Sequence, residues 1–115
     1  MALDNAKRIT TDLLCLHLLM ERDMYVYEMA QEIERRSDGT LSMTEAAIYM
    51  SMYRLVENGC VTDRREMVGK KARMRVYYHL TEAGKEYYNT IRDDYWRSVS
   101  AMQSFFGFGD GDTHD

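Results

Sequence analysis

A long apolar stripe near the C-terminal end limits the folds open to this sequence more than any other pattern in it. Between residues 81 and 106, apolar side chains recur at spacings of four and three: Tyr87, Ile91, Tyr95, Val99, Met102 and Phe106. This spacing predicts one amphipathic helix, which at 1.5 Å per residue would be about 37 Å long. A chain of 115 residues makes only a small body, so such an arm needs a second surface to pack against. A second copy of the chain is the simplest source, which predicts a homodimer.

Three further helices and one β-hairpin are predicted before this arm. Apolar spacing predicts helices over 5–22 and 25–37, whose inward residues would be Ile9, Leu13, Leu16, Met20, Val26, Met29, Ala30 and Ile33. A third helix over 44–58 follows a capping box with Ser42 as N-cap and Glu45 reaching back. Alternating residues predict strands over 60–68 and 73–80, joined by a loop at 69–72. Thr81 is the expected N-cap of the arm.

This order of elements predicts a mainly α fold with a β-hairpin, namely a winged helix-turn-helix with a long C-terminal dimerisation helix. Residues 1–80 would form the DNA-binding domain, with the first helix also at the dimer interface. Residues 81–106 would form the dimerisation helix and 107–115 a flexible tail. The third helix would be the recognition helix and the hairpin the wing.

Composition excludes several other classes of protein. The chain contains no proline, is 45% hydrophobic and 30% charged, and has no apolar run of about 20 residues that could span a membrane. Two cysteines and no signal-peptide layout predict a reduced, cytoplasmic protein. Cys15 and Cys60 are buried apolar residues or, alternatively, thiol sensors. No phosphate-binding glycine loop, activated serine or metal-spaced histidine set is present, so neither an enzyme nor a metal or cofactor site is expected.

Positive charge is concentrated in the predicted wing. Although the net charge is −4, residues 64–75 hold six basic residues and one acidic residue, a local charge of +5. Such a stripe on an acidic body can contact phosphates, because exposed charges are screened beyond about 10 Å at 0.1 M salt. A solvated hairpin whose charges guard a strand edge is the alternative.

Three motifs in order resemble the PadR-type transcriptional regulators. They are YVYEM at 25–29, TEAAIY at 44–49 leading to RLVENG at 54–59, and VYYHLTEAG at 76–84. The resemblance implies a homodimeric winged-helix repressor of operator DNA, often of phenolic-stress or multidrug-efflux genes. Met50 stands where the family usually has proline, and Ala46 where it often has glycine. Both changes favour a regular helix and leave the DNA sequence preference open.

The resemblance also implies DNA contacts on the recognition helix and the wing. Its helix positions correspond to Ser42, Thr44, Ala47, Tyr49 and Arg54. Ser42 would serve as a cap beside a phosphate, Thr44 and Ala47 would meet base edges, and Tyr49 and Arg54 would bind phosphates. The wing candidates are Lys70, Lys71, Arg73, Arg75 and Tyr77. Solvated surface is the alternative for each, and a stack of Arg75 on Tyr77 is a further one.

Small members of the family bind flat aromatic compounds between the protomers, against the first and last helices. The corresponding candidates are Arg8, Asp12, Cys15, Tyr88, Arg92 and Trp96, and a packed dimer core is the alternative. Arg8 or Arg92 would suit an acidic phenol, whereas Asp12 or Asp94 would suit a cationic drug. The function predicted is therefore a DNA-binding regulator, a repressor released by a small aromatic effector. The alternatives are a winged-helix protein-interaction module without DNA binding and a carrier of aromatic compounds.

Overall fold

The computed structural model describes the backbone of residues 2–107 and the side chains of residues 9–107. The elements are α1 (Ala2–Glu21), α2 (Val26–Arg36), α3 (Glu45–Glu57), β1 (Val61–Val68), β2 (Arg73–Leu80) and α4 (Glu82–Phe106). This is the predicted mainly helical fold with one antiparallel hairpin. Apart from Gly107, the predicted tail at 107–115 lies outside the described residues.

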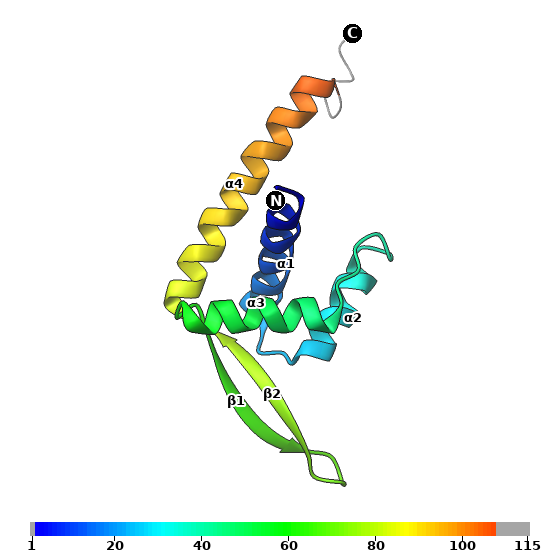
Figure 1. Ribbon diagram of the computed structural model, residues 1–115, viewed down its shortest axis with the longest axis vertical. Coiled ribbons are helices and arrows are strands. Elements are labelled where there is room, and N and C mark those ends of the chain that lie inside the picture. The colour runs from blue at the N-terminus through cyan, green and yellow to red at the C-terminus, as the bar shows by residue number, and fades with distance from the viewer. Residues whose placement is uncertain (1, 108–115) are drawn as a thin grey trace.

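The helices form a small body from which the hairpin and α4 project at opposite ends (Figure 1). α1 contacts α2, α3, β2 and α4, so it is the central element of the body. α4 runs beside α1 and then continues beyond it (Figure 1), which makes the described chain 61 Å long and only 29 by 28 Å across. None of the described helices has the length and apolar character needed to cross a membrane.

The predicted ends of α4 are confirmed by its caps. The hydroxyl of Thr81 accepts a hydrogen bond from the backbone N–H of Gly84 at 3.0 Å, as an N-cap does. Gly107 ends the helix in the left-handed conformation, with φ of 79°, which glycine adopts without a steric penalty. Local sequence signals therefore set both limits of the arm.

The core is built mostly from methionine, leucine and isoleucine. Fully buried side chains come from every side of the body and include Leu16, Met24, Met29, Ile48 and Met52. The inward face predicted for α2 is correct, since its residues Val26, Met29 and Ile33 are buried and Ala30 packs against them. Unbranched methionine side chains adapt to the irregular space between these short elements.

The inward face predicted for α1 is wrong in part. Ile9 and Met20 are exposed, whereas Asp12, Cys15 and Leu19 are buried beside Leu16. α1 is covered by four other elements, so its buried face is wider than one stripe and is rotated from the predicted line.

The hairpin has two different faces. Its register pairs Val61 with Leu80 and continues to Val68 with Arg73. Asp63, Arg65 and Met67 therefore share one face with their partners Tyr78, Val76 and Met74, and the alternate residues share the other face. At its base, the backbone N–H of Tyr78 donates to the carbonyl of Met24 at 2.9 Å, which fastens the hairpin to the segment between α1 and α2.

Candidate nucleic-acid interface

The N-terminus of α3 is capped by Thr44 and not by Ser42. The Thr44 hydroxyl accepts a hydrogen bond from the backbone N–H of Ala47 at 3.0 Å. Ser42 is exposed two residues earlier, so the capping box predicted for Ser42 and Glu45 is wrong. The chain is extended at Thr44, with φ of −71° and ψ of 155°, and becomes helical at the next residue. Thr44 is thus the N-cap of α3. A helix N-terminus that remains exposed, as this one does, favours anions nearby.

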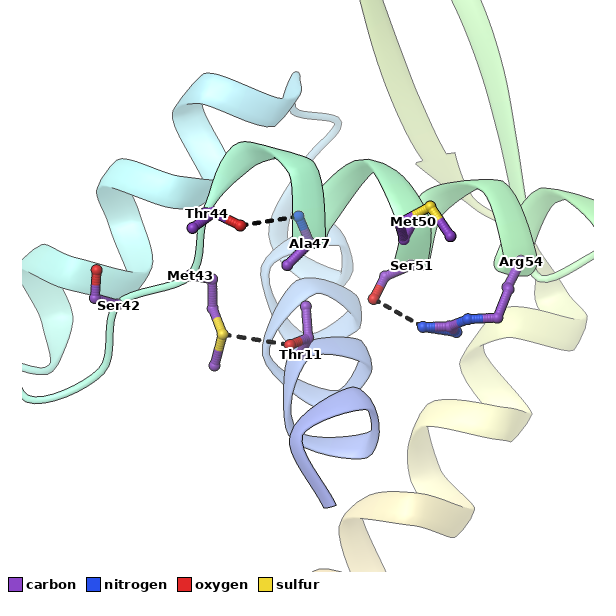
Figure 2. Close-up of a pocket in the computed structure, with 8 residues that line it drawn as sticks. All are labelled: Thr11, Ser42, Met43, Thr44, Ala47, Met50, Ser51 and Arg54. Carbon is purple, nitrogen blue, oxygen red and sulfur yellow. Dashed lines mark hydrogen bonds between the residues drawn. The ribbon is translucent and has the colours of Figure 1, made fainter. Parts of the chain in front are cut away.

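One side of α3 faces α1 across a cavity of about 430 Å³ (Figure 2). Its lining comes from the approach to α3, from α3 itself and from α1: Thr11, Ser42, Met43, Thr44, Ala47, Met50, Ser51 and Arg54. The Thr11 hydroxyl donates to the sulfur of Met43 at 3.3 Å across the cavity. Ala47 is half-buried here, so the expectation that it lies on the exposed side of the first turn is wrong.

Arg54 also lies on this side of α3. Its guanidinium donates to the carboxylate of Asp12 on α1 at 3.2 Å and to the hydroxyl of Ser51 at 3.2 Å. The side chain of Asp12 is 6% exposed, whereas that of Arg54 is 29% exposed. Arg54 therefore neutralises a buried carboxylate, and the phosphate contact expected from the sequence would require it to leave that partner.

The side of α3 away from the buried Ile48, Met52 and Leu55 forms an exposed ridge, which we define as Ala46, Met50 and Tyr53. Met50 also lines the cavity. Met50 is 63% exposed and Tyr53 is 67% exposed, and Ala46 lies one helical turn before Met50. Tyr49 is half-exposed beside the ridge, on the side of a groove shared with Asp63 and Tyr78 of the hairpin. Of the residues expected at base edges or phosphates on α3, only Thr44 and Tyr49 are exposed. Sequence reasoning missed the ridge, although helical spacing places it opposite the buried Ile48, Met52 and Leu55.

Four cations of the hairpin are exposed and have no ion-pair partner among the described residues. They are Arg65, Lys70, Lys71 and Arg73. Lys70, Lys71 and Arg73 surround a shallow pocket of about 330 Å³ at the hairpin loop, together with Arg75. Arg65 belongs to the basic run and is not among the predicted contacts. It lies on the hairpin face shared with Tyr78. The wing thus presents positive charge at its tip, away from the body (Figure 1).

Arg75 and Tyr77 are half-buried against the start of α2. The guanidinium of Arg75 lies 4.3 Å from the centre of the Tyr25 ring, and Tyr77 meets the same ring edge-on at 5.5 Å. The alternative of a stack between Arg75 and Tyr77 is thus replaced by contacts of both residues with Tyr25. These contacts hold the wing to the body, and they leave Lys70, Lys71 and Arg73 as its outermost candidates.

Asp23, between α1 and α2, also fastens the wing to the body. Its carboxylate accepts hydrogen bonds from Arg64 and from the ring of His79, the latter at 2.8 Å. Burial opposes ionisation, but the hydrogen bonds from His79 and Arg64 outweigh it and lower the pKa of Asp23. Arg64 also pairs with Glu66 at 2.6 Å, so this arginine of the basic run is neutralised within the protein.

The effector candidates whose side chains the structure describes differ in burial. Asp12 and Cys15 are buried, and burial raises the pKa of the Cys15 thiol to about 12. Their place in a ligand site stays a prediction. Tyr88 is buried too, with its hydroxyl 2.6 Å from Nδ1 of His17. Arg92 lies over the Tyr88 ring at 5.4 Å, and Trp96 is 58% exposed further along α4. The side chain of Arg8 lies outside the described residues.

The outer half of α4 carries several exposed apolar side chains. Tyr95, Trp96, Met102, Phe105 and Phe106 are all exposed, as is Ile9 on the neighbouring helix α1. α4 reaches α1 only through its first part (Figure 1). An apolar surface of this extent is unusual on a small protein and marks an interaction site.

Comparison with known proteins decides the family. Residues 15–90 match the Transcriptional regulator PadR-like family. The chain belongs to this family. Its members are transcriptional regulators and not enzymes. The chain is also 30% identical over 95 residues to uncharacterised protein X of Lysinibacillus sphaericus, covering 83% of this chain and 85% of that protein.

Solved structures of regulators share the fold of this PadR-like chain. A transcriptional regulator from Clostridium thermocellum has a TM-score of 0.78 at 27% identity, covering 88% of this chain and 97% of its own. A PadR family regulator from Clostridium difficile has a TM-score of 0.65 at 24% identity, covering 84% and 96%. Bacillus subtilis PadR in complex with operator DNA has a TM-score of 0.62 at 23% identity, covering 69% of this chain and 43% of that protein.

Proposed function

We propose that this PadR-like protein is a homodimeric repressor that binds operator DNA and is released by a small aromatic effector. The observation that carries the proposal is the exposed side of α3 next to a wing whose outer cations, Lys70, Lys71 and Arg73, have no acidic partner among the described residues. In a winged helix-turn-helix, α3 enters the major groove with its N-terminal turns. The wing cations then contact phosphates beside it. Such a role places the protein in the cytoplasm, with the chromosome.

Dimerisation is supported by the exposed apolar side chains of α4. Packing of the apolar stripe against the same helix of a second copy removes Tyr95, Met102 and Phe106 from water, and burial of apolar area favours association. A twofold dimer carries two recognition helices, which read two half-sites about 34 Å apart along the DNA. This geometry makes a palindromic operator the expected partner.

Release by an effector is supported by the residues of α4 that stay accessible. Arg92 and Trp96 lie one turn apart on α4, and a flat aromatic acid would stack on the indole and pair with the guanidinium. Tyr88 would form the floor of the site through its ring. A ligand at this place lies between the protomers and changes the separation of the two α3 helices, which couples its binding to that of DNA.

The test is a titration of DNA from upstream of the protein's own gene at several salt concentrations. A dimer that makes six to ten phosphate contacts is expected to lose affinity by about 10³–10⁵ between 50 and 200 mM salt. Replacement of Lys70, Lys71 and Arg73 by alanine should abolish most of the binding and reduce the salt dependence. Replacement of Arg35, Lys85 and Arg97 by alanine removes the same charge elsewhere and should leave binding nearly unchanged. Equal loss in both variants contradicts the proposal.

The effector is tested by the fluorescence of Trp96, the single tryptophan of the chain. A panel of aromatic acids and cationic aromatic drugs is titrated with and without DNA. A compound that quenches Trp96 and weakens DNA binding supports release. A compound that binds tightly and leaves the DNA affinity unchanged contradicts it, because coupling between two sites is reciprocal.

A protein-interaction module is the second candidate, and one observation favours it. The exposed side of α3 is apolar and aromatic, and the single basic residue of this helix, Arg54, is paired with Asp12. An apolar helix surface also suits a protein groove. A module of this kind would bind no DNA at low salt and would keep its partner after the wing cations are replaced.

A further inference from the structure

The ridge of α3 lacks the groups that usually identify guanine and adenine. Those bases are read by two hydrogen bonds at once, from arginine or lysine to guanine and from asparagine or glutamine to adenine. The helix sequence EAAIYMSMYRLVE contains no lysine, asparagine or glutamine. Its arginine, Arg54, is on the side facing α1 and donates to Asp12 and Ser51. Bidentate base recognition from this helix would first have to break that ion pair.

The ridge instead offers apolar contact. It presents the methyl group of Ala46, the thioether of Met50 and the ring of Tyr53 in consecutive turns of the helix. In the major groove, the C5 methyl group of thymine is the apolar feature that distinguishes bases. Met50 is at the centre of the ridge, and its flexible side chain can follow the position of such a methyl group. Glu57, the last residue of α3, carries a negative charge, which repels phosphates from the C-terminal turn.

We propose that the ridge reads thymine methyl groups and that Met50 is the central specificity-determining residue. The inference rests on the proposed binding of operator DNA and names the feature of the DNA that the same surface recognises. Ala47, which the sequence suggested for thymine contact, faces the cavity beside α1 (Figure 2). Ala46 is exposed, and Met50 is 63% exposed although it also lines this cavity, so these two residues take over the role.

The test compares thymine with deoxyuridine in a DNA duplex that the full-length protein selects from a random pool. Deoxyuridine pairs with adenine as thymine does and lacks only the methyl group. Each contacted thymine that is replaced is expected to weaken binding about fourfold, the worth of one buried methyl group. Replacement of the equivalent thymines in both half-sites should weaken it about 16-fold, the product of two such losses.

Met50→Ala links the effect to the residue. Alanine is the best helix former and Met50 is exposed, so the variant keeps its fold. The ratio of thymine to deoxyuridine affinities should fall toward one at the position that Met50 contacts. Met67→Ala is the matched control, because Met67 is 59% exposed on the hairpin. It should preserve the ratio even if it weakens binding overall.

Three other experimental outcomes are possible, and each contradicts a different part of the proposal. Equal affinity for the thymine and deoxyuridine duplexes, with sequence selection intact, overturns methyl recognition and leaves the proposed DNA-binding function standing. A ratio that is unchanged in Met50→Ala overturns the assignment to Met50. Failure to select any sequence from the pool overturns the proposed function, and the inference falls with it.

Discussion

Arg54 on α3 forms an ion pair with Asp12 on α1, with Nη1 of the arginine 3.2 Å from Oδ2 of the aspartate. The pair joins the candidate recognition helix to the central helix of the body, which itself contacts α4. Arg54 lies one helical turn after Met50, and both line the same cavity. The ion pair is therefore a neighbour of the ridge on α3.

Loss of Arg54 and loss of Asp12 should destabilise the protein by different amounts. Arg54→Met removes the Arg54 guanidinium from the nearly buried Asp12 carboxylate, and we expect a loss of about 3 kcal/mol, because removal of one partner of a buried ion pair is strongly destabilising. Asp12→Asn leaves Arg54, whose side chain is 29% exposed, able to reach water, and should cost about 1 kcal/mol. Urea unfolding at pH 7 measures both changes. The reverse order would show that the two residues do not stabilise the fold through this pair.

Gly84 is packed so closely that alanine should not fit. A Cβ atom there would lie 2.1 Å from the backbone carbonyl oxygen of Cys60 and 2.6 Å from the side chain of Leu80. Because a backbone atom cannot move aside cheaply, Gly84→Ala should cost about 3 kcal/mol, at the upper end for overpacking. Thermal unfolding followed by circular dichroism measures this loss. Lys85→Ala, at the exposed next position, is the control and should change stability by about 0.5 kcal/mol or less.

Cys15 should resist alkylation in the folded protein. Burial, and then the negative charge of Asp12, raise the pKa of its thiol to about 12, so almost no reactive thiolate is present at pH 8. Iodoacetamide should label it only after unfolding in urea, as mass spectrometry of the digested protein would show. Rapid labelling of the native protein would instead favour the alternative of a thiol sensor.

Local sequence signals were sufficient for the elements and their order. The hydroxyl of Thr81 and the alternation in β2 act over a few residues, and the structure confirms both. The cap of α3 was assigned wrongly because Ser42 and Thr44 both stand before the helix. Either hydroxyl can accept a hydrogen bond from a backbone N–H of the first turn. Only the conformation of the chain just before the helix decides which of the two does so.

Contacts between elements could not be predicted in the same way. The run from Leu13 to Met20 is apolar on several sides of α1, so spacing alone does not define how this helix is rotated. The burial of Asp12 and Cys15 follows from that rotation, as does the pairing of Arg54. The predicted site therefore contained residues of the right helices, some of which turn out to face the interior.

The network around Glu32 should make stability depend on pH in acid. Hydrogen bonds from Arg35 at 2.6 Å and Arg36 at 2.9 Å lower the pKa of Glu32 from 4.5 to about 2. Because the folded-state pKa is below the ordinary value, the stabilisation is complete above pH 4.5 and is lost as the pH falls toward 2. Glu32→Gln should reduce this loss, as measured by urea unfolding between pH 2 and 6. Glu34→Gln, on the same helix and outside the network, should behave as the unchanged protein.

The apolar stripe of α4 should hold the dimer together. Val99 and Met102 lie on this stripe with Tyr95 and Phe106, on the part of α4 that extends beyond α1 (Figure 1). Val99→Glu with Met102→Glu would bury two like charges between the protomers and should give a monomer in sedimentation at micromolar concentration. Ser100→Glu with Ser104→Glu adds the same charge on the opposite side of the helix and should leave a dimer. If all three proteins have the mass of a monomer, the stripe does not mediate self-association, and a palindromic operator is no longer expected.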